Sequence, residues 1–92
     1  MSSSLDTRVD HDLEYSLHEW AAVPTYAAEF ESWDDVHQLD FVVEWAMRED
    51  ALDRLSRYAL DGKLKPAQER RYAELLKLVK RGRPLIRKLL DE

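Results

Sequence analysis

Residues 32–60 contain neither glycine nor proline, and this uninterrupted stretch constrains the fold more than any other feature of the chain. Ser32 is a good N-cap residue, and Asp34 and Asp35 would then lie in the first turn, where the helix dipole favours carboxylates. The stretch therefore predicts one long helix over about residues 32–60. The pattern permits a kink near residues 48–50, and a break into two helices there is the alternative interpretation.

Apolar side chains occur on two sides of the first half of this predicted helix. One side has the spacing i, i+3, i+7, i+11, with Val36, Leu39, Val43 and Met47. At about 100° per residue, the aromatic pair Phe41 and Trp45 lies roughly on the opposite side of the helix. In the second half of the predicted helix, only the side of this aromatic pair remains apolar. A small monomer has difficulty covering both sides, so either the other segments wrap around the helix or a second molecule covers one side.

The aromatic side is the one that we predict to bind a partner, because buried aromatic residues dominate the energetics of interfaces. The predicted partner-binding residues are Phe41, Trp45, Leu52, Asp40 and Glu44. The alternative is that this side faces an internal core.

The flanking segments complete an all-α pattern. Further helices are expected over residues 10–23, over residues 66–80 and in a last short segment that begins at Pro84. Pro24 ends the first of these, a helical turn is expected over residues 25–30, and Gly82 stops the helix that begins at Pro66. No segment alternates with period two for long enough to be a strand.

These elements predict a small antiparallel bundle of four helical segments, because the connections between them are short. Residues 1–9 are expected to form a flexible tail, and residues 10–92 a single helical domain.

The charges divide unevenly along the chain, which carries a net charge of −5. Residues 1–50 hold 13 acidic and 2 basic side chains, whereas residues 51–92 hold 6 acidic and 12 basic ones. The two halves therefore either attract each other or attract separate partners.

The composition of the chain also excludes several classes of functional site. The chain has no cysteine, which excludes disulfides, thiolate metal sites and a cysteine nucleophile, and a cytoplasmic location is expected. No stretch approaches the roughly 18 consecutive apolar residues of a membrane span. No serine lies in a glycine-flanked elbow, and two isolated glycines cannot form a phosphate-binding loop, so an enzyme is not expected.

Two groups of metal-ligating residue types share the spacing i, i+3, i+7. They are His11, Glu14 and His18 in the first helix, and His37, Asp40 and Glu44 in the long one. If the two faces met, they could bind zinc, iron or manganese. Such groups also arise along the solvated side of an acidic amphipathic helix, and on that interpretation no cofactor is expected.

The basic C-terminal half offers an alternative, phosphate-binding surface. Its residues are Lys77, Lys80, Arg81, Arg83, Arg87 and Lys88. A helix-turn-helix motif with Gly62 in the turn is doubtful, because Tyr58 stands where a small residue is needed and Gln68 where an apolar one is needed.

The sequence therefore favours a non-enzymatic helical interaction or regulatory protein that binds a protein partner or forms a homodimer. A nucleic-acid-associated factor is the second hypothesis, and a metal-binding bundle is a remote third. Steep loss of affinity with salt would indicate the second.

Overall fold

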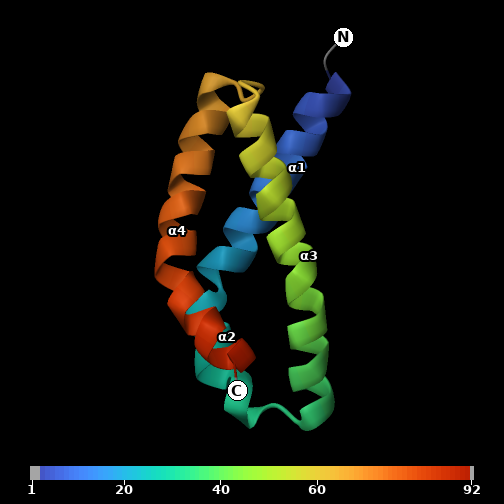
Figure 1. Ribbon diagram of the computed structural model, residues 1–92, viewed down its shortest axis with the longest axis vertical. Coiled ribbons are helices and arrows are strands. Elements are labelled where there is room, and N and C mark those ends of the chain that lie inside the picture. The colour runs from blue at the N-terminus through green and yellow to red at the C-terminus, as the bar shows by residue number, and fades with distance from the viewer. Residues whose placement is uncertain (1–2, 92) are drawn as a thin grey trace.

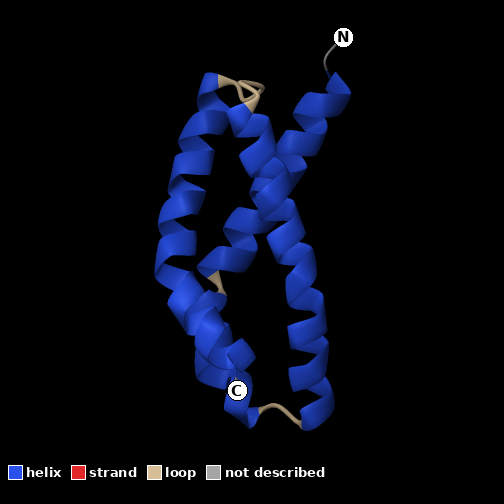
Figure 2. Cartoon of the chain, in the orientation of Figure 1, coloured by secondary structure: helices blue, strands red, loops and turns tan. Residues whose placement is uncertain are grey.

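The fold consists of helices throughout the part of the chain that the structure describes. This computed structural model describes residues 3–91. Its elements in chain order are α1 (Ser3–Ala21), α2 (Val23–Glu29), the 3-10 turn η1 (Phe30–Ser32), α3 (Asp35–Leu60) and α4 (Pro66–Asp91). Figure 2 shows these helices joined by short loops. The predicted all-α helical bundle with a long third helix is confirmed.

The chain direction alternates between the three long helices. In Figure 1, α1 leads down from the N-terminus, α3 returns to the top, and α4 runs down again. α1 packs against both α3 and α4, whereas α2 packs mainly against α4. Because α3 and α4 have few contacts with each other, α1 is the helix that holds them in one bundle. The result is elongated, with extents of 47 × 22 × 17 Å.

The first helix begins earlier than the sequence indicated. From Ser3 onward the chain is helical, Val9 is fully buried, and Leu5 packs against the core. The prediction of a flexible tail over residues 1–9 is therefore wrong for residues 3–9, while Met1 and Ser2 lie outside the described residues. Leu5 and Val9 precede Leu13 in steps of four, so they extend the same apolar face by two turns.

The N-cap of α3 lies two residues later than the sequence predicted. Asp34, rather than Ser32, is the N-cap, and its Oδ1 accepts a hydrogen bond from the His37 backbone N–H at 2.8 Å. Ser32 belongs to η1, where its hydroxyl donates to the Glu29 carbonyl at 2.5 Å. α3 then continues without a break through residues 48–50 and ends before Gly62, whose φ of 68° suits a helix terminator.

The helix predicted over residues 66–80 and the short helix predicted from Pro84 form one continuous helix, α4. α4 passes through Gly82 and contains Pro84 in its interior, so neither residue ends a helix. An interior proline costs about 3 kcal/mol in an isolated helix. Here the buried face continues beyond it, from Leu75 and Val79 to Ile86, and this packing outweighs the local preference for a break.

Side chains from all four α-helices meet in one apolar core. Its buried members are Val9, Leu13, Trp20, Val23, Phe41, Trp45, Leu55, Leu75, Val79 and Ile86. Trp20 and Trp45 meet edge to face with ring centroids 5.0 Å apart, which joins α1 to α3.

Candidate protein-interaction surface

The aromatic side of α3 faces inward in this chain. Phe41 is 7% exposed and Trp45 is 2% exposed. Phe41 contacts the Tyr26 ring at 5.4 Å between centroids, and Trp45 contacts both Trp20 and Phe41. These two aromatic residues are therefore core residues rather than an accessible partner-binding face, which corrects the prediction. α1 and α2 cover them.

A buried polar network holds this inward side in place. Arg48 donates to Glu19 Oε1 at 2.8 Å through Nε, and its guanidinium lies 5.5 Å from the centre of the Trp45 ring. The Tyr26 hydroxyl donates to the same carboxylate oxygen at 3.1 Å. Burial, together with the Glu19 carboxylate, raises the pKa of Tyr26. The network joins α1, α2 and α3 around the aromatic cluster.

The other predicted partner-binding residues have mixed positions. Leu52 is partly buried and packs against the core. Asp40 and Glu44 are exposed.

The opposite side of α3 is apolar and exposed. Four side chains in a row are between 62% and 66% exposed, and Val42 at their edge is 39% exposed. We call this surface the α3 apolar face; its members are Val36, Leu39, Val42, Val43 and Met47. The first half of α3 has one layer of helices to pack against, so a helix that is apolar on two sides leaves one side uncovered.

The sequence contains a signal that could have assigned the two sides correctly. The side of Phe41 and Trp45 continues to Leu55, which is fully buried, whereas the opposite side ends at Met47. The longer side also carries the larger rings, which gain the most from burial.

The border of the α3 apolar face is acidic. Asp35, Asp40 and Glu44 are exposed along it, and residues 21–47 contain no lysine or arginine. His37 bonds through Nδ1 to Asp34 at 2.8 Å. Bonds from the backbone N–H and the ring of His37 hold the pKa of Asp34 below its ordinary value.

A shallow pocket lies on the acidic border. Its volume is about 280 Å³, and it is lined by Trp33, His37, Asp40, Phe41 and Glu44. Two aromatic rings and two carboxylates therefore meet beside the apolar face, a combination that suits a positively charged side chain.

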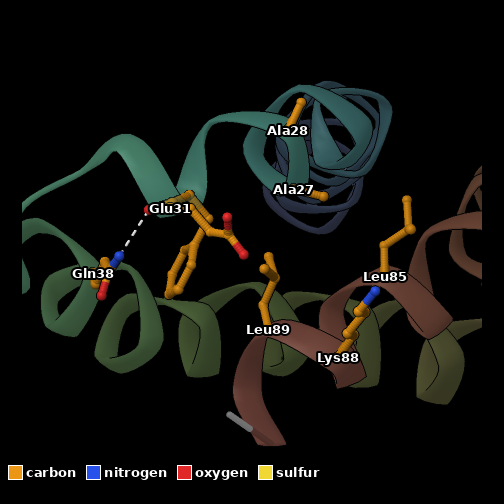
Figure 3. Close-up of a pocket in the computed structure, with 8 residues that line it drawn as sticks. Ala27, Ala28, Glu31, Gln38, Leu85, Lys88 and Leu89 are labelled. Atoms are coloured by element: carbon orange, nitrogen blue, oxygen red, sulfur yellow. Dashed lines mark hydrogen bonds between the residues drawn. The ribbon is translucent and has the colours of Figure 1, made fainter.

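A larger groove lies at the end of the bundle where α2, η1, α3 and α4 meet. Its volume is about 480 Å³, and it is lined by Ala27, Ala28, Phe30, Glu31, Gln38, Leu85, Lys88 and Leu89. Figure 3 shows the α4 side chains facing the α2 alanines across this space, with Gln38 bonded to the η1 backbone. Glu31 and Lys88 supply its two charges.

The two groups of metal-ligating residue types do not meet. His11, Glu14 and His18 line a pocket on α1, whereas the group on α3 lines the pocket beside the apolar face. Across residues 3–91, no three His, Asp or Glu side chains come close enough to hold a metal ion. The structure therefore does not bring the two groups together, as a shared metal site would require.

Five of the six predicted phosphate-binding residues are exposed on α4, and one of them, Lys88, also lines the larger groove. We call them the α4 basic row: Lys77, Lys80, Arg81, Arg87 and Lys88. Arg83 instead turns inward, donates to Glu49 at 3.0 Å and lies 5.3 Å from the centre of the Trp20 ring. A row of cations supplies charge alone, which binds polyanions without selecting among them.

The acidic and basic halves of the sequence attract each other within one chain. Among the described residues, ion pairs connect them: Asp6 with Lys65, Asp10 with Arg71, Asp12 with Arg54, and Glu49 with Arg83. The Asp12 side chain is buried and bonds to two Arg54 nitrogens at 3.0 Å each. These pairs link α1 to α3 and α4, and α3 to α4.

Comparison with family models, with curated proteins and with solved structures finds no match for this chain. None of the helices within residues 3–91 has both the length and the apolar character needed to cross a membrane.

Proposed function

We propose that this protein is a small, non-enzymatic interaction protein that binds another protein through the α3 apolar face. One observation carries the proposal: four aliphatic side chains follow each other along α3, each at least 62% exposed. Single exposed apolar residues are ordinary in folded proteins. A continuous row is typical of a surface that a partner covers.

The dimensions of the α3 apolar face suit a helical partner. From Val36 to Met47 it rises about 17 Å, at 1.5 Å per residue. A helix that lies on such a face anchors at positions i, i+3, i+4 and i+7, and burial of each aliphatic side chain contributes about 1.5–3 kcal/mol. Four such side chains together contribute about 6–12 kcal/mol, which is comparable to the roughly 4–15 kcal/mol that association costs.

Folding accounts for little of this row. No member of the α3 apolar face belongs to the buried core, and Met47, which lines a pocket with His11 and Tyr15 of α1, is still 62% exposed. We therefore expect that Leu39→Ser together with Val43→Ser changes the free energy of unfolding by less than about 0.5 kcal/mol, as surface substitutions do. A side chain that the fold does not need is available for another role.

Site-specific crosslinking tests the proposal, because the chain has no cysteine of its own. Val43→Cys carries a maleimide photocrosslinker on the α3 apolar face, and Ala73→Cys carries the same label at an exposed position on α4. In an extract of the cells that make the protein, we expect a discrete product from the Val43→Cys protein that the Ala73→Cys protein does not give. Purified partner should then bind the unlabelled chain.

The substitution Leu39→Asp should abolish that binding while the circular dichroism spectrum stays unchanged. Identical crosslinked products from both cysteine positions, or binding that Leu39→Asp leaves intact, would show that the α3 apolar face has no specific partner.

A further inference from the structure

We infer that the partner is a basic amphipathic helix that lies along α3, with its apolar side on the α3 apolar face and its lysines or arginines against the acidic border. This inference rests on the proposed function and names the chemistry of its partner. Charge complementarity carries it, since the border offers three exposed carboxylates and residues 21–47 contain no lysine or arginine.

The carboxylates on the border are available to a partner. Asp35, Asp40 and Glu44 are exposed, and no ion pair with a described residue engages them. The nearest arginine in the sequence, Arg48, is bound to Glu19 on the inward side of α3. A basic helix would therefore meet negative charge that the chain does not already neutralise.

The pocket beside the face gives such a helix a place for one cationic side chain. The partly exposed Trp33 lines it together with His37, the largely buried Phe41 and the Asp40 and Glu44 carboxylates. The protein already uses the same chemistry internally, where Arg48 lies 6.0 Å from the centre of the Phe41 ring. Cations over aromatic rings gain about 0.5–2 kcal/mol, more where water is excluded.

A second copy of the chain is a poorer fit to this surface. Two α3 apolar faces in contact would bring two acidic borders together. The arginines further along α3 are already paired, Arg54 with Asp12 and Arg57 with Asp53. The α4 basic row of another copy offers cations. The exposed leucines of α4, which are Leu76, Leu85 and Leu90, are only 37–45% exposed, and at steps of nine and five residues they do not form one continuous helical row.

Two synthetic peptides test the inference. Each has about 18 residues with leucine at helical i, i+3, i+4, i+7 spacing; one carries lysine at the remaining positions and the other carries glutamate. Anisotropy of the labelled peptides, titrated with the full chain, should give a dissociation constant at least tenfold lower for the lysine peptide, a difference of about 1.4 kcal/mol. Asp40→Lys should weaken that binding about three- to tenfold.

Glu14→Lys is the matched control, because it makes the same charge reversal at an exposed position on α1. It should change the dissociation constant less than about twofold. If it weakens binding as much as Asp40→Lys does, or if Leu39→Ser with Val43→Ser leaves binding unchanged, attraction is non-specific and the inference is overturned.

The remaining outcomes separate the inference from the proposed function. Equal binding of both peptides, or a dimer that light scattering detects and Leu39→Asp dissociates, overturns the basic partner and leaves an interaction role for the α3 apolar face. If neither peptide binds, the chain is monomeric and no specific crosslink forms at Val43→Cys, both the inference and the proposed function fail.

Discussion

Gly82 shows how one residue can be misassigned from local sequence. A glycine near the end of an apolar pattern, followed closely by proline, is typical of a helix terminator. In the structure, Gly82 lies inside α4, and a Cβ placed there would be 3.1 Å from Trp20 Cε3 and 3.3 Å from Val23 Cγ1. The glycine is present because a buried indole ring approaches the helix backbone closely, a long-range contact that its neighbours in sequence do not reveal.

Gly82→Ala should therefore destabilise the protein by about 1 kcal/mol, although alanine is the better helix former by a similar amount. The extra methyl group must displace the Trp20 ring, which is 1% exposed and has little room to move. Urea denaturation measures the difference.

The control uses a Trp20→Phe protein, because the smaller phenylalanine ring leaves room for the added methyl group. In that background Gly82→Ala should become neutral or stabilising. If Gly82→Ala alone made the protein more stable, the Trp20 ring would not be the reason for glycine at position 82.

At the scale of the element, the capping of α3 predicts a pH effect. The pKa of Asp34 lies below its ordinary value of 3.8 because the folded state favours the ionised carboxylate, first through the His37 backbone N–H. This contribution to stability is fully present above pH 3.8 and is lost as the pH falls below it.

Asp34→Ala should therefore lower the melting temperature at neutral pH, and the difference from wild type should shrink as the pH falls below about 4. Far-UV circular dichroism measures both. Asp35→Ala, which removes a first-turn carboxylate without removing the cap, should give a smaller difference. A difference from wild type that is the same at all pH values would show that the cap is not ionic.

The existence and type of each element could be predicted from the sequence, but the joins between elements could not. Helical spacing is a local pattern, and it identified α3 and both halves of α4. Whether α4 breaks at Pro84 depends on the contact of Ile86 with the core, and whether residues 3–9 are ordered depends on the burial of Val9. Both are tertiary contacts that override local preference.

The candidate site was predicted only in part. Both apolar sides of α3 were recognised, but the side predicted to bind a partner is buried and the opposite side is exposed. The spacing of Val36, Leu39 and Val43 places them together on one face. Which of two apolar faces is buried depends on where α1 and α2 pack. Spacing alone does not reveal this, although the greater length and the larger rings of the Phe41 side favour that side for the core. The acidic border, by contrast, could be read from the sequence alone.

At the scale of the whole molecule, opposite charges and one apolar core act together. The pairs Asp12–Arg54 and Glu49–Arg83 join helices that also share the core, and α1 contacts both other long helices. The uneven charge of the two sequence halves therefore serves assembly of the bundle, and the α4 basic row and the α3 acidic border are the charges left over on its surface.

Because the helices share one core, loss of a central ring should weaken the whole bundle. Trp45→Ala should lower the free energy of unfolding by about 3–5 kcal/mol without changing the molecular mass in solution. Tryptophan fluorescence and circular dichroism should report the same transition.

Trp45→Phe retains a ring and provides a folded comparison if the alanine variant does not fold. A stable Trp45→Ala protein with an altered mass would show instead that Trp45 lies between chains.

The separation of the two sides of α3 has an evolutionary consequence. Folding requires the side chains at core positions such as Trp45, so a substitution there is selected against whether or not a partner is present. If the α3 apolar face binds a partner as we propose, selection on its side chains comes from that contact and not from folding. In a descendant that loses the contact, the aliphatic row would then be free to become polar while the bundle stays intact, so loss of the row would mark loss of the association.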